Sequence, residues 1–138
     1  MSTKQTITVE TNVAVSPAQA WEVWTSPEHI IHWNFASPDW QCPAAENDLR
    51  EGGKFSWRME AKDGSMGFDY CGTYEQVVAP EKIVKRLDDG RMVEITFSAE
   101  GEGTKVVETF EIEDMNSADM QRAGWQAILE NYKLRAEG

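Results

Sequence analysis

The sequence predicts an α+β fold in which a curved antiparallel sheet of seven strands is covered by one long C-terminal helix. Three observations support this prediction: an alternating apolar pattern near the N-terminus, two short helical segments after it, and a string of strands that ends in one segment of helical period. A chain of 138 residues has the size of one domain and buries enough surface to fold without disulfides or metal ions. We therefore expect a single domain over residues 1–138.

The N-terminal quarter is predicted to form one strand and two short helices. Apolar residues alternate within residues 6–15, which is typical of a half-buried strand. Ser-Pro pairs follow at 16–17 and 26–27. Serine is a good N-cap and proline suits the first helical position, so the pairs predict short helices that end near Trp24 and Trp33.

The rest of the chain is predicted to be a loop over residues 34–44, then a meander of six strands, then a helix. Short turns rich in glycine, proline and aspartate separate the strands. The strands are expected at residues 45–51, 54–61, 67–78, 82–87, 91–99 and 104–113. Residues 117–136 have apolar side chains at helical spacing, and a helix of this length spans about 30 Å, enough to cross the sheet. A curved sheet around one helix leaves a space between them, where a ligand is expected.

The composition is that of a globular protein with many more acidic than basic residues. The net charge of −11 repels phosphate backbones and anionic lipids, which argues against nucleic-acid and membrane-surface binding. No apolar run approaches the roughly 18 residues of a membrane span, and no apolar signal-peptide core is present. We therefore expect a cytoplasmic protein, in which Cys42 and Cys71 stay reduced.

Several motifs are individually weak but occur in one order along nearly the whole chain. They are SPAQAWEVW at 16–24, SPEHI at 26–30, DLREGGKF at 48–55, GTYE at 72–75, PEKIV at 80–84, GTKV at 103–106, GW at 124–125 and NY at 131–132. With these motifs the chain resembles the SRPBCC, or START-like, superfamily, and within it the family named after the activator of heat-shock protein 90 ATPase. The resemblance implies a helix-grip fold, also called START-like or birch-pollen-allergen-like. The eukaryotic co-chaperone has a separate N-terminal region that binds the chaperone, and residues 1–138 leave no room for it.

The candidate ligand-binding residues lie on the inward parity of the strands and of the last helix, or flank the loop at 34–44. Large apolar side chains in such places can fill a core or line a cavity, and the pattern leaves both open. Trp33, Phe35 and Trp40 are expected near the mouth of the cavity. The predicted ligand-binding residues are Trp33, Phe35, Trp40, Phe55, Trp57, Met59, Tyr70, Tyr74, Phe97, Glu108, Trp125 and Leu129.

Glu108 is the most unusual of these residues, because it shares its strand parity with apolar neighbours and should face inward. A carboxylate on an apolar face is costly unless it is paired or protonated. It could act as a general acid or base or anchor a ligand; alternatively it pairs with Arg58 or Lys85, or lies near the open rim of the pocket. A bridge to either basic residue would argue against catalysis.

Other polar residues carry no recognisable chemistry. His29 and His32 have no metal-ligand spacing around them, and no phosphate-binding or dinucleotide-binding glycine motif is present. Asp48 and Arg50 are expected to form a structural ion pair. No catalytic residue, metal or cofactor is therefore predicted.

Three functions are compatible with the sequence. The first is binding of a small hydrophobic molecule in the cavity. The second is an enzyme of the cyclase or hydrolase type that uses Glu108 or a pocket tyrosine. The third is a chaperone-associated interaction module that makes contact through its acidic surface. A small hydrophobic molecule is the expected partner, a homodimer is retained as an option, and nucleic acid and membranes are not expected.

Overall fold

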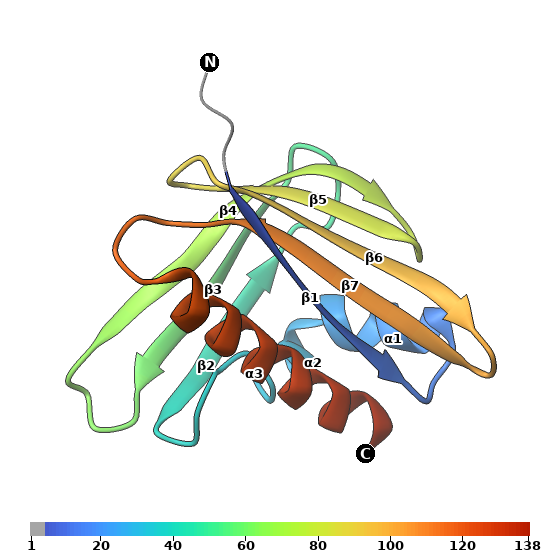
Figure 1. The fold of residues 1–138 in the computed structure, drawn as a ribbon, viewed down its shortest axis with the longest axis horizontal. Helices are drawn as coiled ribbons and strands as arrows, with labels where there is room; N and C mark the ends of the chain where they lie inside the picture. The colour runs from blue at the N-terminus through green and yellow to red at the C-terminus, as the bar shows by residue number, and fades with distance from the viewer. Residues whose placement is uncertain (1–4) are drawn as a thin grey trace.

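The computed structural model describes residues 5–138, in which a strand and two short helices precede six strands and a final helix (Figure 1). The strands and helices are β1 (Thr6–Val13), α1 (Pro17–Thr25), α2 (Pro27–Ile30), β2 (Trp40–Asn47), β3 (Lys54–Ala61), β4 (Gly67–Val78), β5 (Lys82–Leu87), β6 (Met92–Glu100), β7 (Gly103–Glu111) and α3 (Ala118–Glu137). The predicted order of elements is confirmed, and β3, β4 and β5 have the predicted bounds.

The seven strands form one sheet in the order β1-β7-β6-β5-β4-β3-β2, and every neighbouring pair is antiparallel. Strands β2 to β7 follow one another as a meander, and β1 closes the series by pairing with β7. The sheet curls around α3, which packs beside β1 (Figure 1). This is the predicted helix-grip arrangement.

The predicted cap of α1 forms, and α3 has a cap of the same kind. The Ser16 hydroxyl accepts a hydrogen bond from the backbone N–H of Gln19 at 3.2 Å, and the Ser117 hydroxyl accepts one from the N–H of Met120 at 3.1 Å. Each bond satisfies an N–H that has no partner within its helix. Helix α2 is shorter than expected: it ends at Ile30, and turns continue the chain.

Strand β2 differs most from the sequence prediction, because it begins at Trp40, inside the stretch expected to be a loop. Pro43 lies in this strand and cannot donate a backbone hydrogen bond. The strand is at the edge of the sheet, and its register against β3 shifts between Gln41 and Ala44. Proline is tolerated in such a place because no regular ladder bond is lost. The strand expected at 45–51 is therefore displaced toward the N-terminus.

The turn between β2 and β3 contains the predicted ion pair. The Arg50 guanidinium lies 2.9 Å from the Asp48 carboxylate, and both side chains are exposed. Gly53 closes the turn, where a Cβ atom would collide with the backbone oxygen of Asp48. Glycine is required here by this close approach rather than by its backbone angles.

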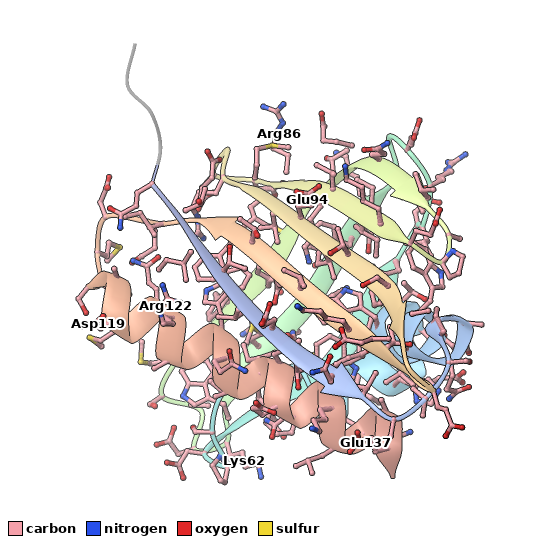
Figure 2. All side chains as sticks on the ribbon, turned by 45° about the vertical axis from the view of Figure 1, so that its right-hand side comes forward. Lys62, Arg86, Glu94, Asp119, Arg122 and Glu137 are labelled. Atoms are coloured by element: carbon pink, nitrogen blue, oxygen red, sulfur yellow. The ribbon has the colours of Figure 1, made fainter. Side chains whose placement is uncertain are left out.

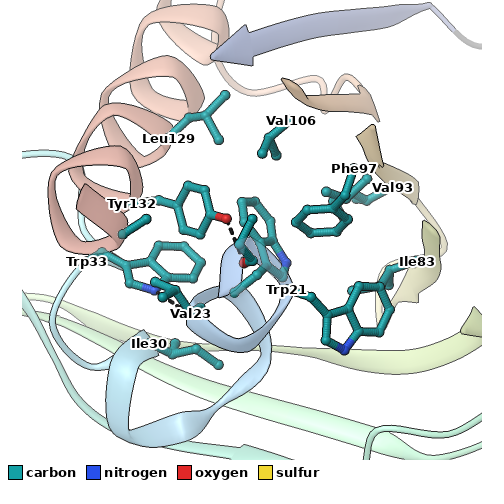
Figure 3. Packing of buried hydrophobic residues seen from close by; sticks show 14 of the residues in the cluster. Trp21, Val23, Ile30, Trp33, Ile83, Val93, Phe97, Val106, Leu129 and Tyr132 are labelled. Carbon is teal, nitrogen blue, oxygen red and sulfur yellow. Dashed lines mark hydrogen bonds between the residues drawn. The ribbon is translucent and has the colours of Figure 1, made fainter. Parts of the chain in front are cut away.

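The core between α1, α3 and the sheet is rich in aromatic side chains (Figure 3). The Tyr132 hydroxyl of α3 donates to the Ala20 carbonyl oxygen at 2.7 Å, and the Trp33 indole N–H donates to the Val23 carbonyl oxygen at 2.9 Å (Figure 3). The two rings meet edge to face, with centroids 5.3 Å apart. These contacts fix α3 to the α1–α2 end of the sheet.

The outer face of the sheet is polar. Arg86 and Glu94 project from it (Figure 2), and they pair with Glu75 at 3.5 Å and with Lys82 at 2.9 Å, respectively. Charged pairs between neighbouring strands suit a solvated face and contribute little net stability. The side chains that face the other way, toward α3, form the site described next.

Candidate functional site

A cavity of about 240 Å³ lies between the sheet and α3. Its walls come from strands β3, β4, β5 and β7, from α1 and α3, and from the segments that follow α2, β5 and β7. The lining residues are Trp24, Trp33, Asn34, Trp57, Met59, Phe68, Tyr70, Lys85, Arg91, Glu108, Glu113, Asn116, Gln121, Trp125 and Ile128. Apolar side chains therefore dominate the wall, and a few polar groups converge on the space, as in ligand pockets generally.

Lys85 and Glu108 bring two ionisable groups to this cavity. Lys85 is 1% exposed and Glu108 is 5% exposed. Strand β6 separates them, because Lys85 pairs with its Val93 and Glu108 with its Ile95. Among residues 5–138, every fully buried side-chain nitrogen or oxygen atom has a hydrogen-bond partner. Neither residue makes a side-chain hydrogen bond or an ion pair within this part of the chain, so the tips of both border the cavity.

Three aromatic rings surround the Lys85 ammonium. Its Nζ atom lies 4.6 Å from the ring centre of Phe55, 4.5 Å from that of Trp57 and 4.7 Å from that of Tyr70. Attraction to the ring faces favours the charged amine. Burial opposes it and lowers the pKa of Lys85 to about 8, although the nearby charge of Glu108 acts in the other direction. Lys85 is thus protonated below about pH 8, with ring faces instead of oxygen atoms around it.

Burial has the opposite effect on Glu108. It raises the pKa of this carboxyl to about 7, against the attraction of Lys85. Arg58 lies on the opposite side of β3, where it pairs with Glu60 at 3.2 Å and with Asp69 at 3.5 Å. The alternative in which Glu108 pairs with Arg58 is therefore wrong. Lys85 acts on Glu108 through its charge, without a direct ion pair.

The segment between β7 and α3 is held in place by Gln121. Its side-chain oxygen accepts from the N–H of Glu113 at 2.9 Å, and its amide nitrogen donates to the carbonyl oxygens of Glu113 at 3.1 Å and Asn116 at 2.8 Å. One turn further along the helix, Trp125 stacks on Phe110 with ring centres 3.9 Å apart. These contacts give the α3 side of the cavity a defined shape.

Half of the predicted ligand-binding residues border the cavity. They are Trp33, Trp57, Met59, Tyr70, Glu108 and Trp125. Trp33 was expected near the mouth but is 1% exposed and belongs to the aromatic core. Two residues of the lining are exposed, Asn116 and Phe68, and Phe68 is 48% exposed. It marks the rim of the cavity at the end of β4 next to the β3–β4 turn.

Four other predicted residues point inward without bordering the cavity. Phe55 lies against the Lys85 ammonium, and the Tyr74 hydroxyl donates to the Asn47 side-chain oxygen at 2.7 Å. Phe97 and Leu129 are buried in the core. Helix α1 explains the position of Phe97, because Trp21 and Trp24 pack on it and fill this end of the curled sheet.

Phe35 and Trp40, the remaining two, lie outside the cavity. Phe35 borders an open hollow between the α1–α2 region and the C-terminal end of α3, and its carbonyl oxygen accepts from Asn131 at 2.6 Å. Trp40 packs on Phe68 with ring centres 6.1 Å apart. Both follow α2, and the path of this segment cannot be read from strand or helix periodicity.

Lys85 is the main cavity residue that is missing from the predicted ligand-binding residues. A signal for it existed, because Lys85 shares its strand parity with the apolar residues Ile83 and Leu87. The polar residues of the rim gave no such signal. Arg91, Asn116 and Gln121 belong to a turn, a loop and a helix start, and only the tertiary fold brings them together.

The remaining polar candidates lie on the surface or are held by neighbours. His29 accepts a hydrogen bond from Arg135 through Nδ1 at 3.2 Å, next to the exposed carboxylates of Glu22 and Glu28. Both cysteines are free thiols. Cys71 donates to Asp88 at 3.1 Å, and this bond raises the pKa of the thiol to about 11. That thiol is therefore a weak nucleophile at neutral pH.

Comparisons with known proteins agree with this architecture. The model of the family described as "Activator of Hsp90 ATPase homolog 1-like protein" matches residues 14–136. The solution structure of the AHSA1-like protein from Aeromonas hydrophila is 41% identical, with a TM-score of 0.89 over 95% of this chain and 91% of that one. A solution structure from Cytophaga hutchinsonii is 46% identical, with a TM-score of 0.82 over 93% and 89%.

More distant structures share the fold alone. A crystal structure of a protein from Chromobacterium violaceum has a TM-score of 0.84 over 97% of this chain and 99% of that one, at 19% identity. No curated protein matches the sequence significantly. In the described part of the chain, no helix is long and apolar enough to cross a membrane. The predicted START-like fold is confirmed, and the chain belongs to the family of activator of Hsp90 ATPase homolog 1-like proteins within the SRPBCC superfamily.

Proposed function

We propose that this protein is a cytoplasmic binding protein for a small, largely apolar molecule, which it holds in the cavity between the sheet and α3. The observation that carries the proposal is the pair Lys85 and Glu108, which border an aromatic-walled space without a hydrogen bond to the rest of the described chain. Burying an ionisable group costs several kcal/mol unless partners compensate it. A bound molecule would supply the missing partners.

The size of the cavity restricts the ligand. Its volume of about 240 Å³ exceeds the roughly 150 Å³ of an engineered apolar cavity that binds benzene. It is below the range of about 300–1,000 Å³ found for drug-sized ligands. A molecule with one ring and a short side chain fits these limits, and the rings of Trp57, Tyr70 and Trp125 offer apolar contact to it.

We expect small aromatic probes to bind with one-to-one stoichiometry. Ile128 borders the cavity from α3, so Ile128→Trp should fill part of the space and abolish binding. Leu134 lies on the same helix but is 70% exposed and away from the cavity, so Leu134→Trp is the matched control and should bind normally. Isothermal titration calorimetry with trans-cinnamate and cinnamyl alcohol makes the measurement. Equal binding by Ile128→Trp and the wild type would refute the proposal, and so would the absence of saturable binding by these two probes and by their amide and amine analogues.

Acid–base catalysis is a second candidate, favoured by the position of Glu108 in the cavity and by its pKa of about 7. A general acid or base works best when its pKa is near the working pH. If a bound molecule is turned over, Glu108→Gln should abolish turnover and leave its affinity within a few fold. Turnover that survives this substitution would remove the candidate.

A chaperone-associated role rests on the family description alone. Its test is recovery of a chaperone on the immobilised wild-type protein.

A further inference from the structure

We propose that the ligand is a small carboxylic acid whose carboxylate lies between the Lys85 ammonium and the Glu108 carboxyl group. The proposal rests on the proposed function, because it names the chemical class of the molecule in the same cavity.

The Lys85 ammonium has donors that the protein does not use. An ammonium carries three N–H donors and no acceptor. Ring faces of Phe55, Trp57 and Tyr70 lie 4.5 to 4.7 Å from Nζ, and no oxygen of residues 5–138 forms a hydrogen bond or ion pair with it. The open direction is the cavity, which the lysine borders. An oxygen atom of a ligand there would be the first strong acceptor, and a charged oxygen would bind most tightly.

The Glu108 carboxyl group can donate a hydrogen bond to the same ligand carboxylate. A protonated carboxyl group offers one O–H, whereas an ionised one only accepts. Burial already favours the protonated form, with a pKa of about 7, and a second carboxylate nearby would favour it further by charge repulsion. Glu108 and the ligand would then share one proton. The buried assembly consists of one ammonium, one carboxylate and one neutral acid, so its net charge is zero.

The other charged groups do not provide an equivalent anchor. Arg91 is positive but pairs with Asp89 at 2.8 Å, and Glu113 is negative and accepts from the N–H of Asn116 at 2.7 Å. The ionisable side chains that line the cavity are Tyr70 from β4, Lys85 from β5, Arg91 from the β5–β6 turn, Glu108 from β7 and Glu113 from the segment before α3. Helix α3 adds only Gln121, Trp125 and Ile128 to the lining, which are uncharged.

Four probes of one shape but different charge test the assignment: trans-cinnamate, cinnamamide, cinnamyl alcohol and cinnamylamine. Calorimetry at pH 6 should show cinnamate binding at least about tenfold more tightly than the alcohol, the gain expected of one buried charge-assisted contact. The amine should bind most weakly. This comparison uses the wild-type protein, so it does not depend on whether any variant folds.

Two lysines of β5 form a matched pair for mutation. Lys85→Met should weaken cinnamate binding at least about tenfold and leave the affinity for the alcohol within a few fold. Lys82→Met is the control, because Lys82 lies on the outer face and pairs with Glu94 at 2.9 Å. It should change neither affinity.

The pH dependence tests the shared proton. Because Glu108 must be protonated to donate, wild-type affinity for cinnamate should fall about tenfold from pH 6 to pH 8. Glu108→Gln keeps a donor that does not titrate, so its affinity should fall over this range only through the loss of the Lys85 proton. A wild-type affinity for cinnamate that falls no more than that of Glu108→Gln would overturn the shared proton.

The failures of the two proposals are distinguishable. Saturable binding of the alcohol or the amide as tight as that of cinnamate, or cinnamate binding that survives Lys85→Met, would overturn the carboxylic acid and leave the proposed function standing. The absence of saturable binding by all four probes would overturn the proposed function itself.

Discussion

Replacing Glu108 with glutamine is expected to remove a loss of stability that the wild-type protein undergoes between about pH 4.5 and 7. The pKa of Glu108 is raised from 4.5 to about 7 in the folded protein. Within this window the folded state keeps a proton that the unfolded state has lost, so unfolding releases a proton and rising pH favours it. The free energy of unfolding falls by an amount on the order of 3 kcal/mol, because each pKa unit corresponds to about 1.4 kcal/mol. Urea unfolding at pH 5, 6 and 7 measures it.

The control for this experiment is Glu100→Gln, a substitution at an exposed position at the end of β6. Its stability should follow the wild-type pH profile, whereas that of Glu108→Gln should separate from it and lie higher at pH 7. Titration of Lys85 has the opposite effect on stability. Its pKa is lowered to about 8, so stability should rise again between about pH 8 and 10.5. Parallel profiles for Glu108→Gln and the wild type would show that Glu108 is not buried as described.

Replacing Trp33 with alanine is expected to cost about 3–5 kcal/mol, the range for removing a large buried ring. The Trp33 ring is 1% exposed and lies 5.0 Å from Trp24, 5.9 Å from Trp57 and 5.3 Å from Tyr132, measured between ring centres. Domains of this size are stable by only about 5–15 kcal/mol, so the variant should unfold at much lower urea concentration.

Two further tryptophan variants separate the causes of this loss. Trp33→Phe keeps most of the packing but removes the hydrogen bond to the Val23 carbonyl oxygen, which should cost about 1 kcal/mol. Trp40→Ala removes a half-buried ring whose aromatic neighbour is Phe68, and it should cost much less than Trp33→Ala. Equal destabilisation by Trp33→Ala and Trp40→Ala would contradict the arrangement of the aromatic core.

The sequence predicted the strands well where alternation and turn residues agree, and less well where tertiary structure decides. Strands β3, β4 and β5 have the predicted bounds because glycine, proline or aspartate marks the turns between them. The predicted bounds of β2 were wrong because Pro43 is typical of a loop. The strand tolerates this proline because it lies at the edge of the sheet and has a local register shift. Which strand forms the edge is a property of the whole sheet.

The candidate site was predictable only in part for a similar reason. Strand parity identified Trp57, Met59 and Glu108 as inward-facing, and the same argument applied to Lys85 would have found the second ionisable group. Parity does not indicate which inward side chains border an empty space. Helix α1 fills one end of the curled sheet, which places Phe97 in the solid core. The cavity lies at the other end, where the start of α3 covers the strands.

Nuclear Overhauser effects from bound trans-cinnamate would show whether a small molecule occupies the space between the sheet and α3. Met59 on β3 and Ile128 on α3 border the cavity from opposite walls, whereas Leu134 borders the open hollow at the other end of α3. We predict effects from the cinnamate ring protons to the methyl groups of both Met59 and Ile128. Effects to Leu134 alone, or none to the two cavity residues at saturating probe, would show that the space between the sheet and α3 does not bind the probe.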